Sequence, residues 1–439
     1  MKQSNKHSIP KGVFDILPNP PSKENIWRTS DHWQYVENLI RDVAQLYGFK
    51  EIRTPIFERT ELFVRSVGES SDIVTKEMYT FEDKANRSMT LRPEGTAPSI
   101  RAFIENGLQN TPPPYKFFYI GPMFRYERPQ SGRYRQHHQF GAEAIGSRKP
   151  EQDVELIDLL CELYRRLGLK NLTVMINSVG DAACREPYKK ALADFLRPNF
   201  DQLSPESQTR LSKNVLRILD SKDEKDQKIL ESSPSILHFL NEECKEHFEK
   251  VCSLLNELKI PYIVNSKLVR GLDYYNKTVF EITSGELGAQ NTVGAGGRYD
   301  GLVSSLGGPD LPAVGFATGI ERLLQTMFKQ NLAFPPASHP YIFLIPIGDS
   351  ASRFCFHLLH TLRQADICAE IDMMHKKVSQ AFQSALHCQA KYVLVVGDEE
   401  LKSGLAKLKE IATHQETLIE LDKIQTHLMP FAKNKFQIK

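Results

Sequence analysis

The strongest pattern in the sequence is an alternation of apolar and polar positions on both sides of a polar, glycine-containing turn, within residues 119–146. A two-residue period is typical of strands, so this segment predicts an antiparallel β-hairpin. On the returning strand Gln139, Gly141 and Glu143 would share one face. The glycine between two longer polar side chains would leave a hole there, with an amide and a carboxylate on its rim. An amphipathic hairpin with a solvated tip is the alternative interpretation.

Helical spacing of apolar residues predicts a helix over residues 24–47, which Gly48 would end. Shorter apolar runs predict strands at 49–54, 78–81 and 88–91. A helix is then expected to begin at Thr96, whose hydroxyl would cap it. Glu94 and Thr96 would thus lie at a strand-to-helix junction, where side chains often face a pocket. An ordinary capped turn is the alternative.

The predicted secondary structure changes in the middle of the chain from mixed helix and strand to helix alone, and then returns to strands. Residues 154–167 predict a helix and 171–176 a strand, whereas 186–258 are charged, helical in pattern and poor in β-branched residues. Strand patterning resumes at Ile260, so the 186–258 stretch predicts an inserted helical subdomain. There follow a strand at 278–283, a glycine cluster and a strand-to-helix junction near Arg322. Exposed amides at such junctions favour anionic ligands.

A proline-containing linker at 329–340 precedes a second region of repeated strands and helices. Strands are expected at 341–347, 369–373, 392–396 and 417–421, and helices at 351–364 and 378–388. This order predicts a small α/β domain with a largely parallel sheet.

Length and composition narrow the choice of protein class. A chain of 439 residues with 41% hydrophobic and 25% charged residues is expected to fold as two or three globular domains. The formal charge of +2 requires any nucleic-acid binding to come from local patches. Seven scattered cysteines without a CxxC pair argue for reduced thiols and against a zinc site. Because no signal peptide or membrane-spanning apolar run is evident, we expect a cytoplasmic protein without a membrane partner.

The two common nucleotide-binding motifs do not fit this sequence, because no Walker A pattern is present and GAGGRY departs from GxGxxG. Arginines can instead clamp a triphosphate, since a guanidinium donates parallel hydrogen bonds to phosphate oxygens. Magnesium would accompany the triphosphate, with Glu82 or Glu127 as carboxylates that could help to hold it. The candidate arginines of the phosphate site are Arg125, Arg133 and Arg322.

A second ligand is indicated by acceptors that a phosphate would not need. They are Glu94, Thr96, Gln139 and Glu143. Acceptors of this kind suit a cationic small molecule, such as one with an α-amino group or an imidazole. The expected chemistry is the attack of a carboxylate on an activated phosphate.

Several segments resemble class II aminoacyl-tRNA synthetases, and specifically the histidyl-tRNA synthetase family. The segment 24–55, FRYERPQSGRYRQHHQFGAEAIG (124–146) and AVGFATGIERLL (313–324) are similar to the three class motifs. LVRGLDYYN (268–276) and AGGRYDGL (295–302) are similar to segments specific to the histidine enzymes, and TLRPEGT (90–96) is a further match. The resemblance implies an α/β multidomain fold whose catalytic domain has an antiparallel β-sheet flanked by helices. The implied domains are a catalytic domain in two parts (1–185 and 259–328), a helical insertion (186–258), a linker (329–340) and a C-terminal α/β anticodon-binding domain (341–439).

The resemblance also implies roles for individual residues. Glu94, Thr96 and Gln139 would hold the α-amino group of L-histidine. The imidazole would be held by Glu143 and Tyr275, with Tyr274 beside them and Tyr299 closing the pocket. Nothing in the chain looks like an editing domain, and a pocket that hydrogen-bonds a polar ring does not need one.

For ATP, the resemblance places Arg125 on the α-phosphate and Arg133 and Arg322 on the γ-phosphate. Arg270 would lie between the substrate carboxylate and the α-phosphate, as a catalytic arginine. The alternative for Arg270 is a buried ion pair with Asp273 or Glu281. His138 is expected to be packed and His137 to lie near the loop that meets the tRNA end.

The implied function is ATP-dependent ligation of L-histidine to tRNA(His) through a histidyl-adenylate, by a homodimer that uses Mg²⁺ with its ATP. Gln130 and Arg133 would contact the acceptor end of the tRNA, the insertion would clamp the acceptor arm, and Lys376 and Lys377 would face RNA. The alternative is a regulatory paralogue, like the synthetase-like subunit of short-form ATP phosphoribosyltransferase. Such subunits usually lack the C-terminal domain and the arginines that this chain keeps.

Overall fold

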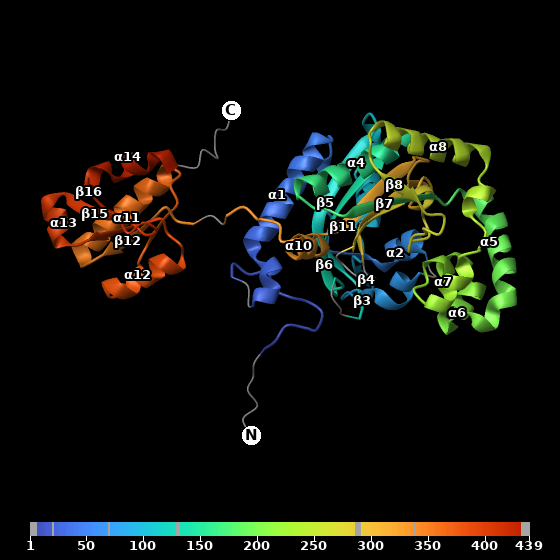
Figure 1. The fold of residues 1–439 in the computed structure, drawn as a ribbon, viewed down its shortest axis with the longest axis horizontal. Helices are drawn as coiled ribbons and strands as arrows, with labels where there is room; N and C mark the ends of the chain where they lie inside the picture. Colours follow the sequence, from blue (N-terminus) through green and yellow to red (C-terminus); the bar gives the residue numbers. More distant parts are fainter. Residues whose placement is uncertain are drawn as a thin grey trace, which may run out of the picture. The chain divides into compact units, whose positions relative to one another are not determined.

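The structure is a computed structural model that describes residues 7–19, 22–68, 71–128, 132–285, 291–336 and 339–431. The chain forms two compact units, Met1–Phe334 and Pro335–Lys439, whose boundary lies within the predicted linker (Figure 1). Among the described residues, no helix combines the length and the apolar character that crossing a membrane requires.

An eight-stranded sheet forms the centre of the first unit. Its strand order is β1 (Lys50–Glu51), β5 (Tyr115–Phe124), β6 (Gln136–Ile145), β11 (Ala313–Gly319), β10 (Thr292–Arg298), β9 (Asn276–Ser284), β7 (Leu172–Ser178) and β8 (Tyr262–Val264). The inner strands are antiparallel, and only the outermost pairs, β1 with β5 and β7 with β8, are parallel. The predicted hairpin is confirmed as β5 and β6, with Tyr119 opposite Gly141.

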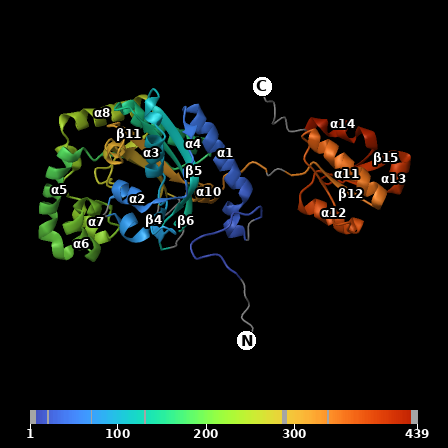
Figure 2. The same ribbon diagram turned by 180° about the vertical axis from the view of Figure 1, so that it is seen from behind.

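Helices cover both faces of this sheet (Figures 1 and 2). α1 (Ser30–Leu46) packs against α4 (Pro150–Arg166) and α10 (Ile320–Lys329), and these three helices share one large apolar core with the sheet. The opposite face contacts α3 (Thr96–Glu105) and the short α9 (Leu302–Ser305). The fold class expected from the sequence, an antiparallel sheet flanked by helices, is confirmed.

The prediction of one helix over residues 24–47 was wrong. A 3₁₀ helix, Lys23–Arg28, ends at Thr29, whose backbone is extended (φ −66°, ψ 129°), and α1 begins at Ser30. The apolar spacing continues through the break because Trp27 and Trp33 enter the same core. The indole of Trp33 also donates to the carbonyl oxygen of Trp27 across the break, at 3.1 Å.

A small antiparallel sheet of β2 (Phe57–Arg59), β4 (Ser88–Leu91) and β3 (Tyr79–Glu82), with α2 (Thr60–Val67) beside it, leads the chain to α3. Between β7 and β8 the chain is helical, as predicted from its pattern. It contains α5 (Ala182–Leu196), α6 (Pro205–Lys213), α7 (Glu224–Leu230) and α8 (Glu242–Glu257). α5, α6 and α7 surround a small core of their own, which includes Tyr188, Leu192 and Leu230 (Figure 1).

The second unit has a five-stranded sheet in the order β13 (Ala369–Ile371), β12 (Ile342–Pro346), β14 (Tyr392–Val396), β15 (Leu405–Glu410) and β16 (Glu416–Glu420). Its helices are α11 (Asp349–Gln364), α12 (Val378–His387), α13 (Asp398–Ser403) and α14 (Ile424–Leu428). The predicted strands β12, β13 and β14 are parallel, but β15 and β16 are antiparallel, so the sheet is mixed. β15 was not predicted although Ala406 and Leu408 alternate with two lysines, because lysine and alanine are depleted in strands.

A buried ion network joins β10, the strand that contains the glycine cluster, to α4 and α8. Arg298 and Asp153 are both fully buried, and the guanidinium donates to the Asp153 carboxylate and, at 3.0 Å, to Asp300. His247 of α8 approaches Asp153 at 3.4 Å. Burial alone would raise the pKa of Asp153, but Arg298 and His247 lower it to about 2. The network therefore carries charge that is compensated only while all its members are present.

Replacing Asp153 with alanine should destabilise the first unit by about 3–5 kcal/mol, because Arg298 would remain buried without its carboxylate. The two tryptophans of the chain, Trp27 and Trp33, lie in the core of this unit. Tryptophan fluorescence during chemical unfolding therefore reports this unit selectively. As a control, Asp310→Ala removes an exposed ion pair with Arg148 and should cost no more than about 1 kcal/mol. Equal losses of stability in the two variants would contradict the network's role.

Candidate active site

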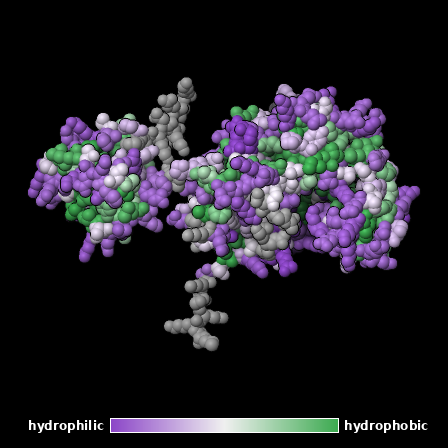
Figure 3. Space-filling model, viewed as in Figure 1, coloured by the Kyte–Doolittle hydropathy of each residue, from purple (hydrophilic) through white to green (hydrophobic). Residues whose placement is uncertain are grey.

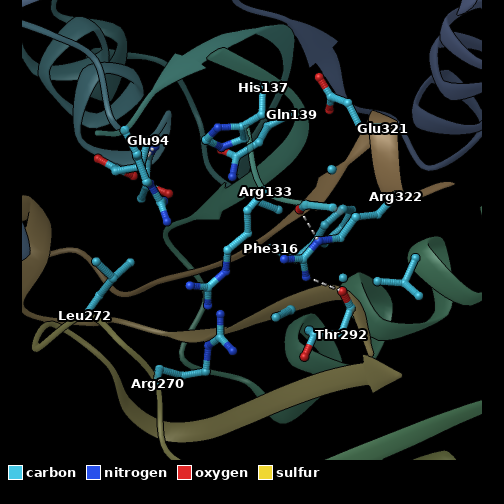
Figure 4. Close-up of a pocket in the computed structure, with 18 of the residues that line it drawn as sticks. Glu94, Arg133, His137, Gln139, Arg270, Leu272, Thr292, Phe316, Glu321 and Arg322 are labelled. Atoms are coloured by element: carbon cyan, nitrogen blue, oxygen red, sulfur yellow. Dashed lines mark hydrogen bonds between the residues drawn. The ribbon is translucent and has the colours of Figure 1, made fainter. Parts of the chain in front are cut away.

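The structure brings most of the predicted site residues together around one cavity of about 220 Å³ in the first unit (Figure 4). Those that line it are Glu94, Thr96, Arg125, Arg133, Gln139, Arg270, Tyr274, Tyr275 and Arg322. Glu143 and Tyr299 lie directly behind the cavity wall and contact its residues. Gln130, predicted at the tRNA acceptor end, lies outside the described residues, and Glu82, a candidate for metal, lies on β3 away from this lining.

Glu143 is the buried centre of the site. Its carboxylate accepts hydrogen bonds from the hydroxyl groups of Thr96 (2.8 Å), Tyr119 (3.3 Å) and Tyr299. Gly315 lies opposite Glu143 in the β6–β11 pairing, and a Cβ atom there would collide with the carboxylate. Burial raises the pKa of Glu143 to about 8, although the hydroxyl donors oppose this effect.

The hole predicted at Gly141 is not open. The ring of Tyr119, from the paired strand β5, fills it, and a Cβ atom at Gly141 or at Gly95 would overlap this ring. Tyr119 was missed as a site residue. Its signal in the sequence was its position directly across the hairpin from Gly141, in a register that the sequence pattern alone did not give.

Glu94 performs the capping role that was predicted for Thr96. Its carboxylate accepts from the backbone N–H groups of Thr96 (2.7 Å) and Ala97 (2.9 Å), at the start of α3. The prediction of a Thr96 cap was wrong, because Thr96 is itself the first residue of α3 and Gly95 occupies the cap position. The Thr96 hydroxyl is therefore free to donate to Glu143. Burial raises the pKa of Glu94, against the effect of these backbone donors.

Three tyrosines form an aromatic wall beside Glu143. The ring centroid of Tyr274 lies 4.6 Å from that of Tyr275 and 5.3 Å from that of Tyr299. Burial raises the pKa of all three phenols, so their hydroxyl groups stay protonated and can donate. Nearby, Oε1 of Gln139 is buried and has no hydrogen-bond partner among the described residues. This wall can therefore hold a flat polar ring while Gln139 keeps an acceptor available.

Arginines occupy the other side of the cavity. Arg125 donates to the carbonyl oxygen of Pro93 (2.8 Å), and Arg322 donates to those of Gly132 (3.1 Å) and Thr292 (2.6 Å). Figure 4 shows the guanidinium groups of Arg133 and Arg270 directed toward one another across the cavity. Like charges that face each other repel, so this arrangement favours a polyanionic ligand between them.

Arg133 and Arg270 each have one carboxylate partner as well. Arg133 pairs with Glu127 at 3.2 Å, and Arg270 pairs with Glu281, one of the two partners considered in the alternative interpretation. Nε of Arg270 is buried without a hydrogen-bond partner among the described residues. The Arg270 ion pair and a place in the cavity wall are thus both present, and the pair orients the guanidinium.

The two adjacent histidines point in different directions. His137 lines the cavity, where burial and the charge of Arg125 hold its pKa well below the usual value and keep it neutral. His138 packs edge-on against Trp33, with ring centroids 4.9 Å apart, as predicted, and its ring contacts Glu321 at 3.0 Å. His137 is a cavity residue that the sequence analysis did not assign to a ligand contact, whereas Glu127, a candidate for holding magnesium, does line the cavity.

Away from the cavity, Asp181, Cys184 and Cys244 form the group in the described part of the chain whose atoms are close enough to share a metal ion. Both oxygens of Asp181 already accept hydrogen bonds, from the backbone of Cys184 (2.9 Å) and the side chain of Asn241 (2.8 Å). Asp181 and Asn241 cap α5 and α8 respectively. This cluster therefore ties together the starts of the first and last helices of the helical segment.

Comparisons with known proteins point to one enzyme family over nearly the whole length of the chain. The family model of histidyl-tRNA synthetase matches residues 27–323, and that of the anticodon binding domain matches residues 341–428. The histidine–tRNA ligase of Protochlamydia amoebophila (strain UWE25) is 56% identical over 429 residues, covering 98% of this chain and 100% of the relative. That of Bacillus subtilis (strain 168) is 46% identical over 426 residues, covering 96% and 98%. The crystal structure of apo S. aureus histidyl-tRNA synthetase superposes with a TM-score of 0.80 at 38% identity, covering 97% of this chain and 100% of that one.

A polyanion site beside a buried acceptor pocket, carried on an antiparallel sheet, is the arrangement of a class II aminoacyl-tRNA synthetase, and the matches support this class. The matches also identify one family within this class. The chain belongs to the histidyl-tRNA synthetase family. The resemblance stated from the sequence segments, and the enzyme class that it implied, are confirmed.

Glu143 should make stability fall as pH rises through the window between its unfolded and folded pKa values. Its pKa is about 8 in the folded chain and about 4.3 in an unfolded chain, so the folded state keeps a proton that the unfolded state loses. Glu143→Gln removes this dependence. The unfolding free energy of the variant, relative to the wild type, should therefore rise between pH 5 and pH 8, with a slope of up to about 1.4 kcal/mol per pH unit. Parallel curves for the two proteins, followed by tryptophan fluorescence, would contradict the buried, protonated state.

Proposed function

We propose that this cavity activates L-histidine with ATP and transfers it to tRNA(His). The observation that carries the proposal is the division of the cavity into two sides. One side has a buried carboxylate and tyrosine hydroxyls, and the other has four arginines. The first side suits an amino acid with a polar ring, and the second suits a triphosphate.

On the histidine side, Glu143 and Tyr275 would hold the imidazole nitrogens, with Tyr274 and Tyr299 enclosing the ring. An imidazole N–H would replace one of the hydroxyl donors that now satisfy Glu143. Glu94, Thr96 and Gln139 would surround the α-amino group, and the unpartnered oxygen of Gln139 supports this role. A non-polar analogue would leave Glu143 buried without its donor, which is how such a site rejects other amino acids.

On the phosphate side, Arg125 would contact the α-phosphate, and Arg133 and Arg322 the γ-phosphate. The histidine carboxylate would attack the α-phosphorus, and pyrophosphate would leave with the P–O bond electrons. Arg270 would stabilise the charge that develops between the two, without a proton transfer. ATP would arrive with Mg²⁺, and Glu127, a carboxylate of the cavity lining, would face this ion.

For the second step, a basic groove supports an RNA substrate. The groove runs from α5 and α6 to Arg270 and Tyr275 of the cavity, and its cationic residues are Arg185, Lys189, Lys190, Arg197, Lys213 and Arg217. We infer that it receives the acceptor strand, whose 3′ end would then reach the adenylate. Gln130 and Arg133 keep their proposed contacts at the acceptor end.

The remaining parts of the proposal concern assembly and location. The second unit would bind the anticodon, in line with its family match.

Homodimer formation is supported by exposed apolar side chains that follow α1, namely Ile56 and Phe57, with Phe57 lying against Phe81 of β3. The domain limits proposed are 1–185 with 259–328, 186–258, 329–340 and 341–439. Because tRNA is charged in the cytoplasm, we propose that location.

The first test is histidine-dependent exchange of labelled pyrophosphate into ATP in the absence of tRNA. The wild type should exchange with histidine alone, and Arg270→Ala should lose about 10²–10³ in rate, as expected for a preorganised donor to the transition state. Arg148→Ala, at an exposed site away from the cavity, serves as the control. If no amino acid supports exchange although histidine binds, the regulatory interpretation replaces the enzymatic one.

A second test concerns the basic groove. Lys190 and Lys213 are exposed, and their double replacement by alanine should raise KM for tRNA. The dependence of log KM on log salt concentration should flatten by about one unit for each phosphate that a lysine no longer neutralises. Pyrophosphate exchange should not change. Lys225→Ala with Lys228→Ala, on α7 outside the groove lining, is the matched control. The groove assignment fails if both double variants behave alike in tRNA charging.

A further inference from the structure

Residues 268–275, between β8 and β9, form a loop that lies between the active-site cavity and the basic groove beside α5 and α6. Arg270, Leu272 and Tyr275 line both of these spaces. Tyr274 lines the cavity, and Asp273 lines the groove. The 268–275 loop is thus a wall that the cavity and the groove share. An RNA end that enters by the groove therefore meets this loop before it meets the cavity.

Two arginines of the helical segment hold the backbone of this loop from the groove side. Arg185 of α5 donates to the carbonyl oxygen of Tyr275 at 2.9 Å. Arg217, in the 3₁₀ helix Val215–Asp220, donates to the carbonyl oxygen of Gly271. Both acceptors are adjacent in sequence to residues proposed for the reaction or belong to them. The helical segment therefore helps to shape the active site without lying in its cavity.

The side chains of the loop are divided between two apolar cores. Val269 packs against the core that α5, α6 and α7 surround. Leu272 and Tyr274 pack against the core on the α3 and α9 side of the sheet. In addition, Nδ2 of Asn214 donates to the Asp273 carboxylate at 3.4 Å. A change at the helical segment can therefore reach the histidine side of the cavity through contiguous contacts.

Arg185 and Arg217 line the basic groove and can exchange the loop for another acceptor. In the described part of the chain neither guanidinium forms an ion pair, so no carboxylate neutralises their charge. A carbonyl oxygen is a neutral acceptor, whereas a phosphate oxygen is charged and gives a hydrogen bond that is about twice as strong. Figure 3 shows mainly purple, polar surface over α6 and α7, which suits a phosphate backbone better than an apolar partner. A phosphate in the groove therefore competes with the loop for both guanidinium groups.

We propose that Arg185 and Arg217 are positioning residues that couple RNA in the groove to the histidine pocket. Without RNA they hold the 268–275 loop in the shape that directs Arg270 and Tyr275 into the cavity. When phosphates occupy the groove, both guanidinium groups turn to them, and the loop loosens between the adenylate and the incoming 3′ end. The two ligands then oppose each other, so RNA in the groove weakens the binding of histidine. The inference rests on the proposed function, because it assumes histidine and tRNA as substrates.

The first part of the test is histidine-dependent pyrophosphate exchange by the full-length protein without RNA. Arg185→Met should raise KM for histidine about tenfold, as expected for the loss of one hydrogen bond from a charged donor, because its acceptor belongs to Tyr275. Arg217→Met should also lower kcat, because Gly271 directly follows Arg270. Lys222→Met is the control: Lys222 is 75% exposed in the same helical segment and does not line the groove. Unchanged constants in both arginine variants would overturn the proposal.

The second part repeats the exchange with saturating tRNA(His) whose terminal ribose has been oxidised with periodate, so that it binds but accepts no histidine. This RNA should raise the KM for histidine of the wild type and of Lys222→Met by about fivefold or more, which is within the usual range of coupling between two sites. It should change the KM of Arg185→Met with Arg217→Met little, whereas a merely structural role would leave the response to RNA intact. An unchanged or lowered KM in the wild type, or a full response in the double variant, contradicts the coupling. Absence of exchange in the wild type would instead reject the proposed function.

Discussion

The burial of the Glu143 carboxyl group constrains the rest of the active site. A carboxyl group without water must have its oxygens hydrogen-bonded, and its partners come from three separate segments: Thr96 at the start of α3, Tyr119 on β5 and Tyr299 after β10. The hydrogen bonds to Glu143 therefore fix α3 against the sheet, and they fix the end of β10 against both. Glycines at positions 95, 141 and 315 provide the space that this arrangement needs.

The arginines obey a different constraint, since their charge must remain available to a ligand. Arg125 and Arg322 are oriented by backbone carbonyl oxygens, which fix a guanidinium without neutralising it. Arg133 and Arg270 have carboxylate partners, yet they face each other across the cavity. The protein thus holds four cations around one space, and a polyanion that enters would relieve the repulsion that the two carboxylates leave uncompensated.

Much of this was predictable, because strand alternation and motif spacing act over short distances. The β5–β6 hairpin, the strand-to-helix junction before α3 and nine of the residues that line the cavity followed from local patterns or from family resemblance. What failed depended on register or on distant partners. Tyr119 fills the space at Gly141 because of the hairpin register. Glu94 accepts from the first N–H groups of α3 because Thr96 is itself the first residue of that helix. The break at Thr29 left no trace in a periodicity that both tryptophans preserve.

The near-neutral net charge of the chain has a consequence for RNA binding. Non-specific attraction to a phosphate backbone grows with the number of cations that a protein presents, and a formal charge of +2 presents few in excess. Positive charge is instead concentrated locally, as in the groove beside α5 and α6. An RNA gains from this charge only where its phosphates reach the groove. Local concentration of charge in a nearly neutral chain therefore ties RNA binding to particular surfaces, and composition alone could not have revealed them.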